Sequence, residues 1–175
     1  IKQYVYENTS YPLALTGIID ENGHRYATWT YNADGKAISS QHYGGADLFT
    51  FDYSQYSKTT VTNPLGKKTT YTYTIINNKK LVTRVDGIAS ANCAAANKLY
   101  EYYADGRMKS KTDWKNVKTT YQYNTAGQEI SRTEASGTTE ARTITTEWHP
   151  TLYVKTKITE PGKQTTFSYD TNGRL

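Results

Sequence analysis

A short pattern of residue types recurs along the chain, and an internal repeat constrains a fold more strongly than composition does. Each copy begins with a turn-forming stretch and continues into threonines and two aromatic residues separated by one position. The copies span 63–73, 113–123, 160–169 and 20–31. The copy at 20–31 has one additional residue between Gly23 and Thr28, which predicts a β-bulge.

A second block, with glycine after a short polar stretch, follows several of these copies. It covers 31–36, 103–107, 123–128 and 169–174. Asn or Asp begins a type I turn well, and only glycine enters the left-handed region without strain. We therefore expect the chain to reverse at each of these glycines. Ala104 stands where the other copies carry Asn or Asp, which predicts a different turn type there.

Residues that alternate along an extended strand point to opposite faces of a sheet. Tyr71 and Tyr73 would thus share one face while the threonines between them share the other. The same alternation is expected at 121–123 and 167–169. The residues expected to define the repeat are Tyr31, Gly35, Gly66, Tyr71, Tyr73, Gly106, Tyr121, Tyr123, Gly127, Tyr169, Asp170 and Gly173. The predicted fold class is all-β, with stacked antiparallel hairpins in a curved or spiralling sheet.

The composition agrees with a strand-rich chain whose apolar contacts come from aromatic rings. Leu, Ile, Val and Phe make up only 27 of the 175 residues, a proportion typical of disorder when the net charge is high. The net charge is only +5, however, and Tyr and Thr supply about a quarter of the residues, both of which favour strands. The Ala-rich stretch 88–98 is expected to be an inserted loop, with at most a helical turn.

No residue pattern indicates catalysis, a cofactor or a metal site. The histidines are His24, His42 and His149, without the spacing of a zinc site, and Cys93 is the only cysteine. Aspartates recur at turn positions, where they are expected to cap backbone amides. Lys and Arg are scattered, which disfavours a nucleic-acid site, and no apolar run could span a bilayer. We expect a protein that is not an enzyme.

Together, the two blocks resemble the YD repeat of Rhs proteins, wall-associated toxins, Tc toxin shell subunits and teneurins. The stretch Tyr169-Asp170-Thr171-Asn172-Gly173-Arg174 is most similar to the family core. The stretches 60–67, 90–93 and 143–150 resemble bacterial Rhs segments in particular. The resemblance covers about 18–175, and 1–17 is taken as a lead-in to a single repeat segment of a larger protein.

The resemblance implies a non-catalytic part of a shell that encapsulates a C-terminal toxin domain in a secreted or cell-surface bacterial protein of the polymorphic toxin class. The expected partners are neighbouring repeats of the parent chain and the enclosed toxin. Open sheet edges would also allow self-association. The self-cleaving Asp-Pro site of such shells has no counterpart, because the chain contains no Asp-Pro pair.

A second interpretation is an adhesion module that binds glycans or a cell surface. Trp29, Trp114 and Trp148 would be the ring contacts for a sugar. Aromatic residues are also what a chain with few aliphatic residues must use for packing. A structural role for these rings is therefore the competing interpretation.

Overall fold

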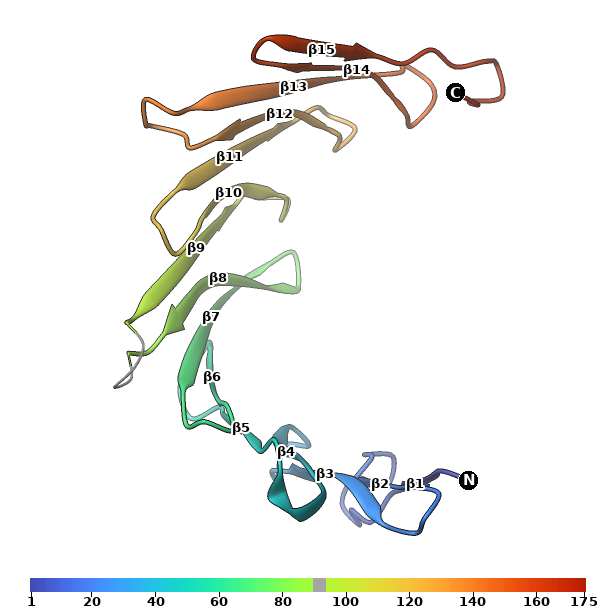
Figure 1. The fold of residues 1–175 in the computed structure, drawn as a ribbon, viewed down its shortest axis with the longest axis vertical. Coiled ribbons are helices and arrows are strands. Elements are labelled where there is room, and N and C mark those ends of the chain that lie inside the picture. Colours follow the sequence, from blue (N-terminus) through green and yellow to red (C-terminus); the bar gives the residue numbers. More distant parts are fainter. Residues whose placement is uncertain (90–93) are drawn as a thin grey trace. The chain divides into compact units, whose positions relative to one another are not determined.

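The structure is a computed structural model that describes residues 1–89 and 94–175. Its strands follow chain order in a single antiparallel sheet, and each strand neighbours the next one in sequence (Figure 1). The strands are β1 (Gln3–Val5), β2 (Gly17–Ile19), β3 (Arg25–Tyr31), β4 (Ala37–His42), β5 (Phe49–Asp52), β6 (Lys58–Thr62), β7 (Lys68–Ile76), β8 (Lys79–Gly87), β9 (Ala96–Tyr102), β10 (Met108–Thr112), β11 (Lys118–Tyr123), β12 (Glu129–Glu134), β13 (Arg142–Trp148), β14 (Lys155–Glu160) and β15 (Lys163–Thr166). A single 3-10 turn, η1 (Tyr43–Gly45), is the only helical element among the described residues. The predicted all-β class with stacked antiparallel hairpins is confirmed.

Contacts divide the chain into two compact parts, which we describe separately. The first part comprises Ile1–Tyr73 with Val85–Ala96, and the second comprises Thr74–Arg84 with Asn97–Leu175. Each part consists of hairpins from the same antiparallel ladder.

One turn geometry recurs between the strands. In the β3–β4 turn, the amide of Gly35 donates to the Asn32 carbonyl at 3.0 Å, and the amide of Asn32 donates to the Lys36 carbonyl at 2.9 Å. The Asn32 Oδ1 atom also accepts the amides of Asp34 and Lys36. Gly35 has φ +73°, the left-handed conformation that closes a type I turn. The same pair of backbone bonds recurs in turns that begin at Asp20, Asn63, Tyr103, Asp113, Asn124 and Asp170.

The turn at 103–107 keeps this geometry, so the prediction of a different turn type at Ala104 is wrong. Gly106 (φ +87°) donates to the Tyr103 carbonyl, and Tyr103 donates to the Arg107 carbonyl. Tyr103, and not Ala104, occupies the first position of this turn, the position that Asn32 holds in the β3–β4 turn. Asp105 Oδ1 replaces the missing cap by accepting the Arg107 amide at 2.9 Å.

The predicted bulge in the copy at 20–31 is confirmed. Ile18 pairs with Ala27 and Ile19 pairs with Arg25, so Tyr26 has no partner residue on β2. The other three copies of the first block show no such shift. Thr62 pairs with Lys68, Thr112 with Lys118 and Glu160 with Lys163, each followed by regular pairs.

Two strand boundaries differ from the sequence-based expectation. Strand β15 ends at Thr166, so Phe167 and Tyr169 lie beyond the strand in which they were expected. Strand β15 pairs with β14, and Glu160 and Lys163 flank the two-residue turn between them. The stretch 88–98 is not entirely a loop, because β9 begins at Ala96. Ser90 and Cys93 lie outside the described residues, and the described residues of this stretch form no helix.

The ladder register sorts the side chains onto two faces. Residues paired across antiparallel strands point to the same side. In the first part, Thr30, Ser39, Thr50 and Thr62 form one continuous row across β3–β6. The residues next to this row on β5 and β6, Phe51 and Val61, therefore point to the opposite face.

The second part shows the same hydroxyl row but a more polar opposite face. Ser110, Thr120, Thr133 and Thr143 are paired in sequence across β10–β13. The opposite face carries the row Tyr121–Arg132–Ile144. On β12 and β13 this face therefore carries a charged and an aliphatic residue beside the Tyr121 ring.

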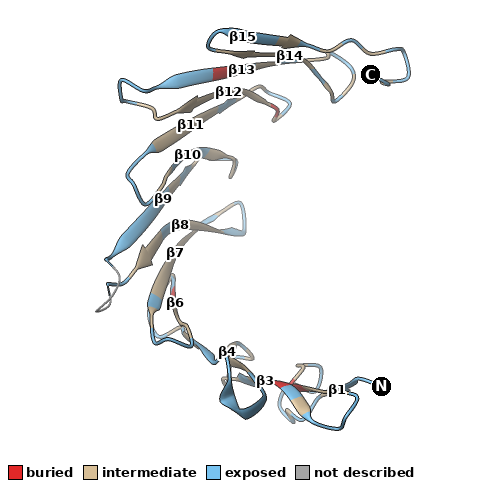
Figure 2. Ribbon diagram, viewed as in Figure 1, coloured by how far each residue is buried: buried red, intermediate tan, exposed pale blue. Residues whose placement is uncertain are grey.

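The sheet has no closed hydrophobic core in the described residues. Within residues 1–89 and 94–175, the buried apolar residues are Ala27 and Ile144, and no large side chain is fully buried. Little of the ribbon in Figure 2 has the colour of buried residues. Most strand residues are half-buried, since each is covered by its neighbours on adjacent strands and not by a second layer. Stability in such an arrangement comes from contacts between adjacent strands.

Replacing Gly66 tests the left-handed turn directly. No atom lies within 4 Å of a Cβ built at Gly66 (φ +76°), so the cost of a side chain there is a backbone cost. We expect Gly66→Ala to lower the free energy of unfolding by about 1 kcal/mol, measured by urea denaturation. Gly66→Asn should cost less, because Asn116 holds the same turn position at φ +63°. Equal losses of unfolding free energy for Gly66→Ala and Gly66→Asn would contradict a left-handed backbone at this turn position.

Candidate functional site

Tyrosine hydroxyls connect neighbouring strands through backbone carbonyls. The Tyr31 hydroxyl donates to the Leu15 carbonyl at 2.7 Å, and the Tyr53 hydroxyl donates to the Ala37 carbonyl at 2.8 Å. In the second part, Tyr102 donates to the Val82 carbonyl at 2.7 Å. Each ring sits at or just beyond the end of its strand and reaches back to the preceding hairpin arm. Partial burial raises the pKa of Tyr53 and Tyr102, and each phenol remains a donor at neutral pH.

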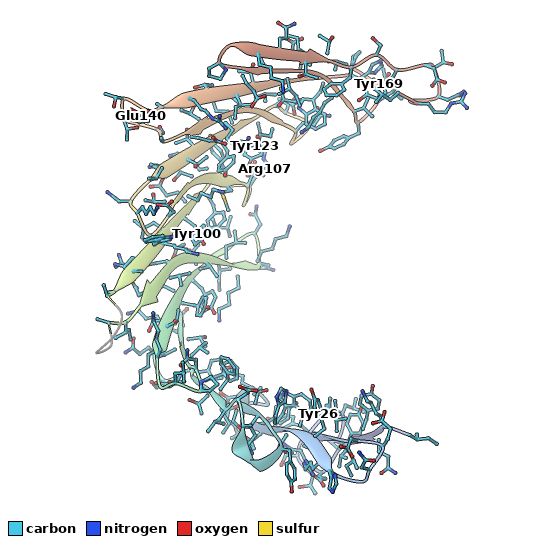
Figure 3. The ribbon with its side chains drawn as sticks, in the orientation of Figure 1. Tyr26, Tyr100, Arg107, Tyr123, Glu140 and Tyr169 are labelled. Atoms are coloured by element: carbon cyan, nitrogen blue, oxygen red, sulfur yellow. The ribbon has the colours of Figure 1, made fainter. Side chains whose placement is uncertain are left out.

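A depression of about 570 Å³ in the second part is built around Arg107. Its guanidinium lies 5.0 Å from the Tyr123 ring centre. Both residues are labelled in Figure 3. The guanidinium also donates to Asp105 Oδ2 at 2.7 Å and to the Asn124 carbonyl at 3.0 Å. The Tyr103 ring meets Tyr123 edge-on at 6.2 Å between centres. Arg107 is therefore fixed by a carboxylate, a ring and a backbone carbonyl, and it links the turn at 103–107 to the turn that begins at Asn124.

A second depression of similar size lies on the face that carries Tyr121 and is lined by ion pairs. The Arg142 Nε atom donates to Glu134 Oε2 at 2.9 Å. The Arg132 Nε atom lies 3.1 Å from the other Glu134 oxygen, without a well-aligned hydrogen bond. One carboxylate thus bridges two arginines across β12 and β13. These pairs are part-exposed, so their net contribution to stability is small.

The repeat-defining tyrosines do not form one cluster. Tyr71 and Tyr73 lie on β7 in the first part. A register shift separates Gln122 from Tyr123 on β11, and Tyr121 and Tyr123 line different depressions. The shift arises on β12, where Ile130 is the additional residue between Glu129 and Ser131, so β11 has no insertion between Tyr121 and Tyr123. The glycines at 35, 66, 106, 127 and 173 all adopt positive φ at chain reversals.

The three tryptophans occupy different environments. Trp29 is half-buried on β3 in the first part. The Trp148 indole N–H donates to the Glu129 carbonyl at 2.8 Å, and its ring lies 5.5 Å from Tyr153. Trp114 is 60% exposed in the turn between β10 and β11. Trp148 is thus a packing residue, and of the three only Trp114 presents most of its surface to solvent.

Carboxylates at the turns are held in their charged form by backbone amides. Two backbone amides donate to Asp20 Oδ1 and two to Asp170 Oδ1. The largest effect on the pKa of each carboxyl is a backbone hydrogen bond, from His24 to Asp20 and from Arg174 to Asp170, and both pKa values are lowered. The pKa of Asp105 is lowered mainly by the Arg107 side chain.

The histidines and the other candidate metal ligands form no metal site in the part of the chain that the structure describes. His149 Nδ1 accepts the Leu152 amide at 3.0 Å and thereby caps the connection from β13 to β14. Within residues 1–89 and 94–175, no three His, Cys, Asp or Glu side chains gather closely enough to hold a metal ion. In the same residues, no helix has the length and apolar character needed to cross a bilayer. Cys93 lies outside the described residues.

Sequence reasoning missed the residues that link the hairpins most specifically. The sequence pattern predicts no contact for Arg107, although an arginine after the turn glycine recurs at Arg174, which binds Asp170. Tyr53 and Tyr102 were not singled out. Their signal was available, since each occupies a strand-end position comparable to that of Tyr31.

These features define a hairpin-repeat protein with an open, single-layer antiparallel sheet. No family model matches the sequence, and no curated protein matches it. The chain is similar in fold to a crystal structure of TcdB2-TccC3-Cdc42, with a TM-score of 0.53, 14% identity and 99% of the chain covered. A TcdB2-TccC3 structure without its hypervariable C-terminal region gives a TM-score of 0.47 at 11% identity, covering 97% of the chain and 11% of the matched one. A Tc holotoxin pore from Photorhabdus luminescens gives a TM-score of 0.26 at 10% identity, covering 97% of the chain and 13% of the matched one.

The first of these comparisons confirms the resemblance to YD-repeat proteins at the level of the fold. The chain spans 9% of the length of the TcdB2-TccC3-Cdc42 chain that it matches. The match therefore concerns a segment of sheet and not a whole protein.

Removing the Tyr31 hydroxyl should weaken the sheet. Tyr31→Phe leaves the Leu15 carbonyl without its donor, and we expect a loss of about 1 kcal/mol in the free energy of unfolding. Tyr56, which is 93% exposed, provides the matched control, and Tyr56→Phe should have no measurable effect. Equal free energies of unfolding for Tyr31→Phe and the unsubstituted 175-residue chain would show that the hydrogen bond to the Leu15 carbonyl does not contribute to stability.

The turn carboxylates predict a loss of stability in acid. Because folding lowers the pKa of Asp20 and Asp170 below the ordinary value of 3.8, their contribution is present above that value and is lost as the pH falls through the folded pKa. Asp170→Asn keeps the amide-accepting oxygen but cannot titrate. The difference between urea midpoints at pH 7 and pH 3 should therefore shrink in this variant.

The reciprocal change serves as the control for acid sensitivity. Asn32 caps its turn with the same two amide contacts but is uncharged. Asn32→Asp should enlarge the difference between the midpoints at pH 7 and pH 3. An unchanged difference in both variants would mean that the turn carboxylates do not contribute to acid unfolding.

Proposed function

We propose that this chain is a structural, non-catalytic segment of a YD-repeat shell, in which the whole of 1–175 belongs to one repeat array. The observation that carries the proposal is a ladder of sequential antiparallel hairpins whose described residues form almost no buried apolar core. Such a sheet gains stability from adjacent repeats and presents two extended faces. The likeness in fold to a segment of TcdB2-TccC3-Cdc42 supports it.

The finer proposal is that the parent is a secreted or cell-surface bacterial protein of the Rhs type, whose shell encloses a C-terminal toxin domain. Neighbouring repeats and the enclosed domain would then be its partners. The hydroxyl rows suit a face in contact with water or with a polar chain, since Thr and Ser can both donate and accept hydrogen bonds.

Extending the chain by neighbouring repeats of its parent tests the shell function. We expect the longer chain to have a higher melting temperature, since each added hairpin covers an edge strand and its rings. The 175-residue chain alone should form concentration-dependent oligomers in analytical ultracentrifugation, because exposed strand edges pair with other copies. A stable monomer, with the same melting temperature as the longer chain, would refute the shell function.

The second proposed function is binding of glycans at an exposed aromatic surface. The high exposure of Trp114 favours it, whereas the packing of Trp148 against Tyr153 and the Glu129 carbonyl gives that ring a structural role. The two functions are compatible, because a shell segment can also present a binding surface on its outer side.

A further inference from the structure

Four aromatic side chains gather at one end of β3 and β4 in the first part of the chain. Tyr26 stacks on the His42 imidazole with 5.0 Å between ring centres and 29° between planes. His24 lies 6.0 Å from the Tyr43 ring at 50°. His42 Nδ1 also lies 3.2 Å from Asp47 Oδ2. We call His24, Tyr26, His42, Tyr43 and Asp47 the ring cluster.

The ring cluster faces solvent and does not fill a core. Tyr26 and Tyr43 are 50% and 68% exposed, and the side chains of His42 and Asp47 are 47% and 67% exposed. Tyr26, labelled in Figure 3, is the residue without a partner on β2, so the bulge positions this ring separately from the ladder. A ring used only for packing would be covered by its neighbours, as Trp148 is.

A backbone hydrogen bond fixes the turn next to the ring cluster, and the space beside its two glycines is open. The His42 amide donates to the Ala46 carbonyl at 2.7 Å, which fixes the turn that carries Tyr43. Gly44 and Gly45 adopt φ of +69° and +82°, and no atom lies within 4 Å of a Cβ built at either one. Asp47 is a non-glycine residue at φ +51°, a conformation that costs energy unless the surroundings favour it.

We propose that the ring cluster is a binding site for a neutral pyranose sugar. A pyranose has an apolar C–H face that packs against an aromatic ring and a rim of hydroxyls that needs donors and acceptors. The cluster supplies both, with two phenol rings for the C–H face and two phenol hydroxyls, imidazole nitrogens and the Asp47 carboxylate for the rim. An acidic sugar fits less well, because the exposed Asp47 carboxylate would repel it.

This inference rests on the second proposed function, glycan binding, and assigns it to residues other than the three tryptophans. The shell function does not depend on it. The experiment must therefore separate binding at the ring cluster from binding at Trp114, which is the exposed tryptophan in the other part of the chain.

Saturation-transfer NMR on the full 175-residue chain, with the methyl glycosides of glucose, galactose, mannose and N-acetylglucosamine, tests the proposal. We expect transfer to at least one of these sugars, with a dissociation constant in the millimolar range, on the order of 1–10 mM. Tyr26→Ala and Tyr43→Ala should each weaken binding by about tenfold, while Tyr26→Phe retains most of it. Circular dichroism melting curves would establish that each variant is folded.

Trp114→Ala and Tyr56→Ala are the matched controls, since both remove exposed rings outside the cluster. Neither should change the binding of the sugar. Loss of binding in Trp114→Ala with full binding in folded Tyr26→Ala would overturn the ring cluster as the site while preserving the glycan function. Absence of transfer to all four sugars would overturn both.

Discussion

A left-handed residue in the fourth position of a five-residue turn governs how the hairpins form. Gly35, Gly66 and Gly127 adopt this conformation, and Asn116 adopts it in the turn that begins at Asp113. The turn geometry sets which residues of the two arms pair, and the pairing sets which side chains share a face. A shift of the strand pairing by one residue would move the hydroxyl rows to the face that carries the rings.

The register produces a sheet that is one layer thick. Rings such as Tyr31 and Tyr53 are covered on one side by neighbouring strands and satisfy their hydroxyls on backbone carbonyls of the preceding arm. Because each link joins adjacent strands, stability is distributed along the ladder and not concentrated in a core. In such a single-layer sheet the total stability grows with the number of repeats, and both faces remain accessible.

The hairpins were predictable from sequence because turn chemistry is local. Asn32, Gly35 and Gly127 carry their conformational preferences whatever surrounds them. The links between hairpins were not predictable in this way. Arg107 reaches Tyr123 and Asn124 only because β10 and β11 are neighbours, and Tyr26 meets His42 only because a bulge redirects it. Side-chain contacts between strands depend on twist and on bulges, which the spacing of residue types does not specify.

Native-state hydrogen exchange, followed by mass spectrometry, tests the central claim that stability comes from neighbouring strands. The account predicts graded protection of backbone amides, with the edge strands β1 and β15 exchanging first and strands flanked on both sides exchanging later, with different opening free energies. A closed globule held by one core would behave differently. Loss of protection in all strands together, in a single cooperative opening, would contradict the account.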